Sequence, residues 1–589
     1  MKRIVTFIFL SALFFTNLPA QDSIPKGWVT FFEASGYMET PRYDEAIAYF
    51  NKLAQNSPFA KMLPIGTSAQ GRTIYCFIAA RNKEFTPEEA HRSGKAIVLL
   101  NNGIHAGEIE GKDASMMLLR DILITKEKEY LLDNNIFMVI PVLNVDGHER
   151  ISPYNRINQN GPKEMGWRTT AQNINLNRDF MKADAPEMQA LLRLFSSWLP
   201  DFFIDSHTTD GADYQYSVTY EMEKFGDIYH STAEWIKNIF IPYFENRVEE
   251  KGFLIAPYVS FKDDQMGKGI QEWASLPRLS TGYASLQNRP SLLIETHMLK
   301  PYKERVFSTK ACLEAVLEYC NNKSRALKVL NQEADNNSIR ELTVGGKFLP
   351  VEFTATDKKK TFMFKGYSSF QDSSLIAGEK ITRYSKEKKT FEIPYFYDVR
   401  PTDSVPVAKA YIIPHEWGIL TERMRLHGIV IKELEKDTTL LAGRYRFSNV
   451  KFANWPYEGH FQPSYELTSF RQKVNVPKGS YLVSADQRTL RVIVNLLEPK
   501  APDSFVKWGF LNAIFEQKEY FEDYSMEPIA EEMLGKDVKL KEEFQKKLQN
   551  DESFRQSPQK RLYFFYERSP YFDKVLNLYP VMRLEEENN

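Results

Sequence analysis

The sequence has few cysteines. Only three occur among 589 residues, which excludes a framework held together by many disulfides. Cys312 and Cys320 lie in a segment of helical periodicity, where eight residues of helix would separate their Cα atoms by about 12 Å. A disulfide spans roughly 7 Å at most, so these two cysteines cannot pair with each other. Either could pair with Cys76, but we expect three buried thiols.

The sequence also lacks a net charge of either sign. Its 76 Lys and Arg residues nearly balance 77 Asp and Glu residues, which argues against a dedicated nucleic-acid surface. It contains no internal repeat and no long low-complexity linker. Hydrophobic residues make up 43% of the chain and aromatic residues 13%, as in a folded globular protein. On a prior of roughly 150 residues per domain, we expect two or more domains, while the oligomeric state stays open.

Long hydrophobic runs are absent beyond the first 20 residues, which excludes a conventional membrane span later in the chain. The opening segment, "MKRIVTFIFLSALFFTNLPAQDS", has two basic residues, then an apolar stretch from Ile4 to Phe15, then Pro19 and Ala20. This order is typical of a secretory signal peptide. Cleavage near Ala20 would remove Lys2 and Arg3 and leave 74 of the 76 basic residues against 77 acidic ones. We therefore expect a secreted or periplasmic protein with a signal peptide over residues 1–20.

The first half of the chain alternates strand-like and helical patterns, which predicts an α/β fold with a mixed central sheet flanked by helices. The expected strands are "TIYCFIAA", "KAIVLLNNG", "NIFMVIPVLN", "PDFFIDSH" and "RPSLLIET". Helical spacing occurs in "EGKDASMMLLRDIL", "APEMQALLRLFSSWL" and "STAEWIKNIFIPYFENRV". We assign residues 21–335 to this domain.

The composition changes after about residue 336. Short alternating runs follow one another, namely "KFLPVEFTA", "KTFMFKGY", "KAYIIPHEW", "GIVIKEL" and "TLRVIVNLL". They predict a β-rich accessory domain over residues 336–589. The segment "APDSFVKWGFLNAIFEQKEYF" begins with Pro502 and a possible N-cap at Asp503, so we expect the chain to end in helices.

Polar groups follow three of the predicted strands, at the ends where open α/β sheets bind their ligands. His105 and Glu108 come after "KAIVLLNNG", His207 ends "PDFFIDSH", and Glu295 ends "RPSLLIET". Two histidines and one glutamate suit a catalytic Zn²⁺, which takes three protein ligands and keeps one position open for water. Glu295 would then be free to act as a base.

At these residues the sequence resembles the zinc carboxypeptidases of the M14 family, of the carboxypeptidase A type. The matching segments are "GTSAQGRTI", "HAGE", "NVDG", "WRTTAQNINLNRDF", "DSH" and "LLIETH", which occur in the family's order over roughly residues 60–300. The later segment "VNVPKGSYLVSADQRTLRVIVNLLEPKAPDSFVKWGF" is similar to an extension found on large bacterial members. We can attach no chemistry to that extension from the sequence.

The resemblance implies a metallocarboxypeptidase that holds one zinc ion per chain and acts on peptides. It makes His105, Glu108 and His207 the zinc ligands and Glu295 the general base. Zinc lowers the pKa of a bound water from 15.7 to about 7, so that a nearby carboxylate can take its proton during attack on the peptide carbonyl.

The resemblance also implies how substrate is held. Arg168 matches the family arginine that stabilises the developing oxyanion. Asn177 and Arg178 match the pair that binds the terminal carboxylate of the peptide, which would make the enzyme an exopeptidase.

The sequence departs from the family's pattern at two positions. The family often has Asp two residues before the Asn-Arg pair, where it orients a zinc-bound histidine, whereas this chain has Asn175. An amide oxygen can still accept the ring N–H, but it is a weaker partner. The substrate-capping tyrosine of the family is matched best by Tyr283, which lies closer to the base than in the best-known members.

Two other functions are compatible with the same residues. A zinc-dependent amidohydrolase that acts on cell-wall peptides or acylated amino acids would use the same metal site. An inactive peptide- or glycan-binding protein would use the β-rich domain instead, although the complete ligand set together with Glu295 argues against it.

Overall fold

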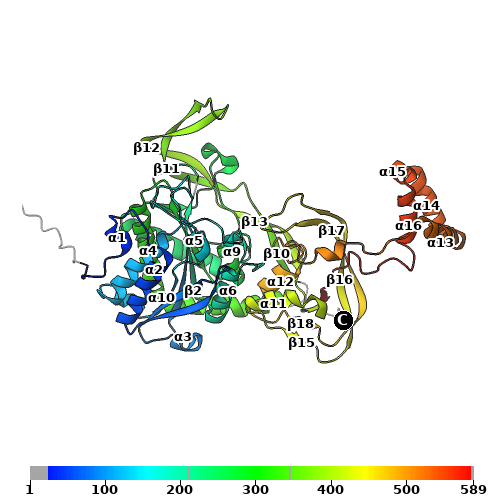
Figure 1. The fold of residues 1–589 in the computed structure, drawn as a ribbon, viewed down its shortest axis with the longest axis horizontal. Coiled ribbons are helices and arrows are strands. Elements are labelled where there is room, and N and C mark those ends of the chain that lie inside the picture. The colour runs from blue at the N-terminus through cyan, green and yellow to red at the C-terminus, as the bar shows by residue number, and fades with distance from the viewer. Residues whose placement is uncertain (1–23, 210, 344–346, 586–589) are drawn as a thin grey trace, which may run out of the picture.

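The structure is a computed structural model that describes residues 24–209, 211–343 and 347–585. Residues 24–343 form an N-terminal lobe, and residues 347–585 form a C-terminal region that extends away from it (Figure 1). The expected signal peptide over residues 1–20 lies outside the described residues.

The N-terminal lobe is built on a mixed eight-stranded sheet in the order β1-β2-β4-β3-β5-β9-β6-β7. Its strands are β1 (Ala60–Thr67), β2 (Thr73–Ala80), β3 (Ala96–Asn102), β4 (Asn135–Ile140), β5 (Phe202–Thr209), β6 (Val218–Glu221), β7 (Ile255–Pro257) and β9 (Ser291–His297). The central strands β4, β3, β5 and β9 are parallel, and β1 and β2 pair antiparallel with their neighbours. Strand β6 is antiparallel to β9 and parallel to β7. The predicted α/β class with a mixed central sheet is confirmed.

Helices cover both faces of this sheet, which explains why its central strands are apolar on nearly every residue. The helices are α1 (Phe31–Ala34), α2 (Tyr43–Asn56), α3 (Pro87–Ser93), α4 (Glu110–Leu123), α5 (Val145–Glu149), α6 (Pro186–Trp198), α7 (His230–Trp235), α8 (Ile241–Glu250), α9 (Ser280–Leu286) and α10 (Tyr302–Thr343), with a π-helical turn over Ile236–Phe240. A hydrophobic core lies on each face of the sheet, and successive side chains of a strand point to opposite cores. Leu99 of β3 belongs to the core that includes α6, and Leu100 belongs to the core that includes α4 and α10.

The C-terminal region contains a six-stranded sheet in the order β15-β18-β14-β19-β16-β17. Its strands are β14 (Ala410–Ile413), β15 (Lys432–Glu433), β16 (Thr438–Phe452), β17 (Pro463–Val476), β18 (Tyr481–Ser484) and β19 (Met582–Leu584), and a separate pair is formed by β10 (Phe348–Ala355) and β13 (Val399–Pro406). Its helices are α11 (Gly418–Leu426), α12 (Leu490–Leu497), α13 (Asp523–Lys536), α14 (Val538–Asn550), α15 (Glu552–Arg555) and α16 (Pro558–Tyr566). The last four form a small cluster of their own, at the right of Figure 1.

A long hairpin of the C-terminal region returns to the N-terminal lobe. Its strands β11 (Lys359–Ser373) and β12 (Lys380–Phe396) form a three-stranded sheet with β8 (Ile270–Gln271), which precedes the helix α9. Phe364 of this hairpin packs against Tyr214 and Tyr216. The C-terminal region is therefore joined to the first lobe along the chain and also through a shared sheet.

Two sequence-based predictions in the C-terminal region are wrong. The segment "TLRVIVNLL" is the buried helix α12 and not a strand, because Arg491 and Asn495, four positions apart, lie on one face of the helix and both donate to Asp227. The segment that begins at Pro502 forms turns, with only a short 3-10 helix at Asn512–Phe515. Asp503 does not cap a helix there, because its carboxylate pairs with Arg278 and accepts the indole N–H of Trp508.

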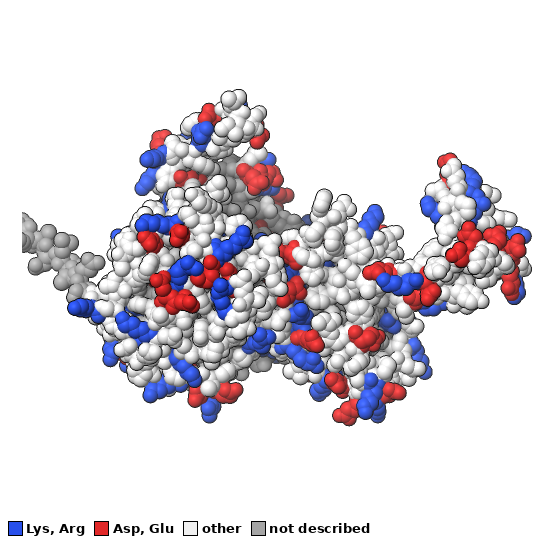
Figure 2. Space-filling view, viewed as in Figure 1, with Lys and Arg blue, Asp and Glu red and all other residues white. Residues whose placement is uncertain are grey.

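The cysteines, the apolar segments and the surface charges follow what the composition predicts. Cys76, Cys312 and Cys320 are buried free thiols. Within the described ranges, no helix is both long and apolar enough to cross a membrane. On the face shown in Figure 2, basic and acidic side chains are interspersed over both parts of the molecule, as the balanced composition predicts.

Candidate active site

The candidate site begins where β3 ends. Gly103 follows the strand with φ of 62°, in the left-handed region that favours glycine. A Cβ atom on Gly107 would lie 2.8 Å from the backbone carbonyl oxygen of Gly166, so this close approach requires glycine. These two glycines turn the backbone so that His105 and Glu108 face the same point, ahead of α4.

His105, Glu108 and His207 form one buried group. Their candidate ligand atoms all lie within 4.8 Å of one another. His105 Nδ1 lies 3.2 Å from Glu108 Oε1, and His207 Nδ1 lies 2.9 Å from Glu108 Oε2. The backbone N–H of Thr208 also donates to Glu108 Oε2 at 3.0 Å. The structure thus brings together the three residues that the sequence assigned to a metal.

The outer nitrogen of each imidazole ring has its own partner. His207 Nε2 donates to the Asp205 carboxylate at 2.9 Å. His105 Nε2 lies 3.0 Å from Asn175 Oδ1, which also accepts the backbone N–H of Asn177 at 3.1 Å. An atom that accepts a backbone N–H is an oxygen, so the ring of His105 donates through Nε2. Both histidines therefore present Nδ1 to the centre of the group.

Burial and neighbouring charges set the ionisation of these residues. Burial lowers the pKa of His105 to about 4, in opposition to the attraction of Glu108. Burial also disfavours protonation of His207, but the Asp205 and Glu108 carboxylates outweigh it and hold the pKa of His207 well above its usual value. Burial disfavours the charged form of Glu108, but its interactions with His105 and Arg156 and its hydrogen bonds with both histidines outweigh burial and hold the pKa of that carboxyl well below its usual range.

These residues fit a zinc ion. His105 Nδ1 is buried and accepts no hydrogen bond from any described residue. Each ring is held by a second partner at Nε2, as the ligating histidines of zinc sites usually are. Two imidazole nitrogens and one carboxylate make a three-ligand set that leaves a position open.

Glu295 lies beside this group. It is on β9, in register with His207 of β5, and both strands end at the same edge of the sheet. Its Oε2 atom is buried and has no hydrogen-bond partner among the residues that the structure describes. Burial raises the pKa of Glu295 to about 8, so this carboxyl can hold a proton near neutral pH.

A pocket of about 310 Å³ opens over these residues. Arg168, Asn177 and Arg178 line it together with the three candidate ligands and Glu295. Arg168 lies 3.3 Å from Glu108 and keeps 43% of its side chain exposed, so its guanidinium can reach a bound molecule. Asn177 Oδ1 accepts the backbone N–H of Ser280 at 3.2 Å, which fixes its amide at the wall.

Tyr283 does not line this pocket. It lies on α9, where its side chain is fully buried against Phe180 and Phe195. Its hydroxyl accepts from Gln287 at 2.8 Å and lies 3.1 Å from His427 Nδ1. The expected substrate-capping role of Tyr283 finds no support in this position.

Four residues at the site escaped the sequence analysis. Asp205 holds His207, Arg156 lies 2.9 Å from Glu108, and Tyr258 and Trp273 line the pocket. The strand alternation in "DFFIDSH" could have placed Asp205 on the same face as His207. Tyr258 and Trp273 lie in irregular segments that carry no periodic signal.

Comparison with known proteins supports the same family over part of the chain. Residues 46–274 match the Peptidase M14 model, described as zinc carboxypeptidase. The chain carries an M14 zinc carboxypeptidase domain. This domain makes the protein a hydrolase of the metallocarboxypeptidase class.

The sequence similarity to known proteins extends beyond the carboxypeptidase domain. The chain is 22% identical over 492 residues to Carboxypeptidase 2 of Trichophyton rubrum, covering 80% of this chain and 84% of that one. It is 22% identical over 463 residues to Carboxypeptidase 2 of Trichophyton equinum, covering 75% and 79%. A metallo-carboxypeptidase structure from Burkholderia cenocepacia has 19% identity and a TM-score of 0.36, over 48% of this chain and 70% of that one. The carboxypeptidase A structure from Helicoverpa armigera has 15% identity and a TM-score of 0.36, over 48% and 74%.

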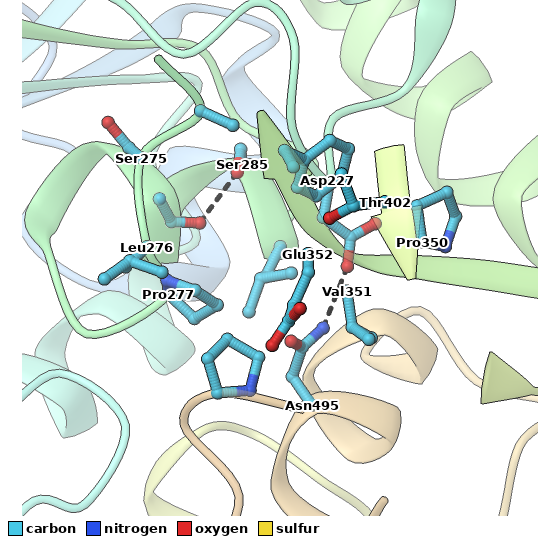
Figure 3. Close-up of a pocket in the computed structure, with 15 residues that line it drawn as sticks. Asp227, Ser275, Leu276, Pro277, Ser285, Pro350, Val351, Glu352, Thr402 and Asn495 are labelled. Atoms are coloured by element: carbon cyan, nitrogen blue, oxygen red, sulfur yellow. Dashed lines mark hydrogen bonds between the residues drawn. The ribbon is translucent and has the colours of Figure 1, made fainter. Parts of the chain in front are cut away.

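A second cavity, of about 260 Å³, lies between the carboxypeptidase domain and the C-terminal region (Figure 3). Asn495 of α12 donates to Asp227 across it at 2.8 Å, and Asp227 also pairs with Arg491. Pro277 and Leu276 face it from the other side. It holds none of the candidate site residues, and its polar contacts fix the C-terminal region against the domain.

Proposed function

We propose that the protein is an exopeptidase that removes residues from the C-terminal end of peptides, with one zinc ion held by His105, Glu108 and His207. The observation that carries this proposal is the convergence of both Nδ1 atoms on Glu108, with Glu295 directly beside them. A zinc ion bound there supplies Lewis acidity and lowers the pKa of the attacking water.

Glu295 would act as the general base. Its carboxylate takes a proton from the attacking water and then delivers that proton to the departing amine. The unpartnered Oε2 atom is the one available for both transfers. Burial raises the pKa of Glu295, which makes its carboxylate a stronger proton acceptor.

The basic side chains of the pocket would hold the substrate. The guanidinium groups of Arg168 and Arg156 lie within 3.3 Å of Glu108, beside the reacting centre, where a fixed positive charge stabilises the oxyanion that develops on the carbonyl. Asn177 and Arg178 offer amide and guanidinium donors to a terminal carboxylate. Tyr258, which lines the same pocket, is the tyrosine we assign to contact with the substrate in place of Tyr283.

We also propose that the mature protein begins near residue 21 and is secreted or periplasmic. The support is the pattern of basic, apolar and small residues over residues 1–20. An exported peptidase would meet peptides outside the cytoplasm, including those of the cell wall.

A peptide panel tests the proposal. The purified mature protein should release the last residue of free-acid peptides, with the products identified by mass spectrometry, and a chelator should abolish the reaction. Metal analysis should find one zinc ion per chain. Equal cleavage of amidated and free-acid peptides would refute the exopeptidase assignment, and activity confined to wall-derived peptides or acylated amino acids would favour an amidohydrolase.

A further inference from the structure

The C-terminal region reaches the active site through one tight turn. Strands β16 and β17 are antiparallel, and the loop between them ends in a turn over residues 457–460. Tyr457 and His460 exchange backbone hydrogen bonds of 2.9 and 3.0 Å. Between them, Glu458 has φ of 49° and Gly459 has φ of 82°, as in a type I′ turn.

Glutamate is a poor choice for the first central position of such a turn. Asn, Asp and Gly are strongly preferred there, because other side chains crowd the backbone at positive φ. An unfavourable residue in a strained position is a reason to look for what its side chain does.

The Glu458 side chain contacts the metal-site support. Its Oε2 atom accepts the backbone N–H of Asn175 at 2.9 Å, across 283 positions of the sequence. Asn175 in turn holds Nε2 of His105 through its side-chain oxygen. A chain of hydrogen bonds therefore runs from the C-terminal region to a candidate zinc ligand.

The turn is held by a contact within the C-terminal region on one side of Glu458 and by a contact with the N-terminal lobe on the other. Tyr457 stacks on the buried ring of Trp508, with centroids 5.9 Å apart and ring planes 14° apart. His460 Nε2 lies 2.7 Å from the carboxylate of Asp184. These contacts on both sides of Glu458 fix where its carboxylate lies.

The "VKWGF" segment singled out in the sequence belongs to the same contact. Asp503 pairs with Arg278 at 2.7 Å, and the Arg278 guanidinium lies 4.8 Å from the ring centroid of Trp508. The residue after Arg278 is Leu279, which lines the pocket. The extension therefore supports the site at this second point as well.

The two candidate zinc histidines are supported unequally. His207 donates to a carboxylate, that of Asp205, whereas His105 donates to a neutral amide. Partners of this kind fix the ring and tune its basicity as a ligand. The Glu458 carboxylate bonds to Asn175, the partner of His105, which is the histidine with the weaker acceptor.

We propose that Glu458 is a positioning residue of the zinc site: it holds Asn175, and through Asn175 the ring of His105, in the orientation that ligation requires. The C-terminal region is then part of the catalytic centre. This inference rests on the proposed function, in which His105 is a zinc ligand.

The substitution Glu458→Gly separates positioning from folding. Glycine suits the turn better than glutamate, so the thermal midpoint of the zinc-free protein should hold or rise. The carboxylate is lost, so zinc should dissociate into a chelator about tenfold faster, the lower end of what partners of ligating histidines contribute. In the zinc-loaded enzyme kcat should fall while KM stays within about twofold, because the pocket is unchanged.

Two further variants serve as controls. Asn449→Gly changes another residue of the same hairpin that has positive φ, 52°, and whose side chain bonds Glu466 within the hairpin. It should leave zinc dissociation unchanged. Glu458→Gln keeps an oxygen that can accept the N–H of Asn175, so it should restore most of the zinc retention.

The outcomes are distinct. If zinc leaves Glu458→Gly as slowly as it leaves the wild type, the positioning role is wrong. A lower thermal midpoint of zinc-free Glu458→Gly than of the zinc-free wild type would assign Glu458 to folding and would also overturn the inference. A wild-type protein that holds no zinc would overturn the proposed function itself, and this inference with it.

Discussion

The Asp205 carboxylate accepts the ring N–H of His207 at 2.9 Å, and the two residues lie two positions apart on the same face of β5. The other oxygen of Asp205 accepts from the Asn101 side chain at 2.9 Å, so the carboxylate is itself fixed. This arrangement leaves Nδ1 of His207 aimed at Glu108. One carboxylate thus sets the orientation of the ring on which metal binding depends.

Asp205→Asn should weaken zinc binding by about 10- to 100-fold, because the amide is a poorer acceptor and carries no charge. Isothermal titration with zinc, or competition with a chelator, measures the change. Asn175→Asp makes the opposite exchange at His105 and should tighten binding. Equal zinc affinity in Asp205→Asn and the wild type would show that the contact has no influence on the ligand.

Glu295→Gln should abolish hydrolysis while zinc stays bound. The amide cannot take a proton from water, so kcat should fall by about 100-fold or more, in line with the usual contribution of a general base. Metal analysis of the same preparation checks that zinc is retained. Full activity in this variant would mean that another group is the base.

Arg178→Ala should remove the preference for a free terminal carboxylate. The variant loses the binding free energy of a charged hydrogen-bonded pair, so KM for free-acid peptides should rise by about 10- to 100-fold. The KM for amidated peptides should stay the same, which makes them the internal control. Arg178→Lys keeps the positive charge but loses the paired donors of the guanidinium, so its KM for free-acid peptides should lie between those of the wild type and Arg178→Ala. A uniform rise in KM for both kinds of peptide would argue for a structural role.

Much of the first lobe could be predicted from sequence because its signals are local. The run "TIYCFIAA" is β2 to the residue, and "EGKDASMMLLRDIL" is α4. The sequence could group His105, Glu108, His207 and Glu295 because they lie at or just after the ends of strands that share one edge of the sheet.

The wrong and missing predictions have two causes, a short segment that was misassigned and contacts between residues far apart in the sequence. In α12, Arg491 and Asn495 have the four-residue spacing of one helix face, but the segment is short and rich in β-branched residues, which favours a strand prediction. The role of Asp503 depends on Arg278, which lies 225 residues earlier. Glu458 and Tyr258 act through contacts of the same long-range kind, and a single sequence carries no sign of them.

Acid should destabilise the protein through buried histidines. Burial lowers the pKa of His427 to about 4, and its ring lies between the Tyr283 hydroxyl and the Met181 carbonyl. The unfolded chain takes up a proton below about pH 6.5, but the folded chain does so only near pH 4. The free energy of unfolding should therefore fall by about 1.4 kcal/mol per pH unit between those values on account of this residue.

His427→Gln should reduce that dependence. The thermal midpoint of the variant, measured from pH 7 to pH 4, should fall less steeply than that of the wild type, whatever its value at pH 7. His91→Gln, on the surface helix α3, is the control for loss of an imidazole. An identical slope in His427→Gln and the wild type would contradict the assignment.

The ion pair between Arg278 and Asp503 should couple the two parts of the chain. Asp503 is fully buried, so Arg278→Met would leave its carboxylate without a charged partner and should cost about 3–5 kcal/mol in urea unfolding. Asp503→Asn keeps an oxygen for the indole N–H of Trp508, and in the double variant no buried charge is left unpaired. The double variant should therefore be more stable than Arg278→Met alone. If the losses of unfolding free energy in the two single variants simply add in the double variant, the two residues do not couple.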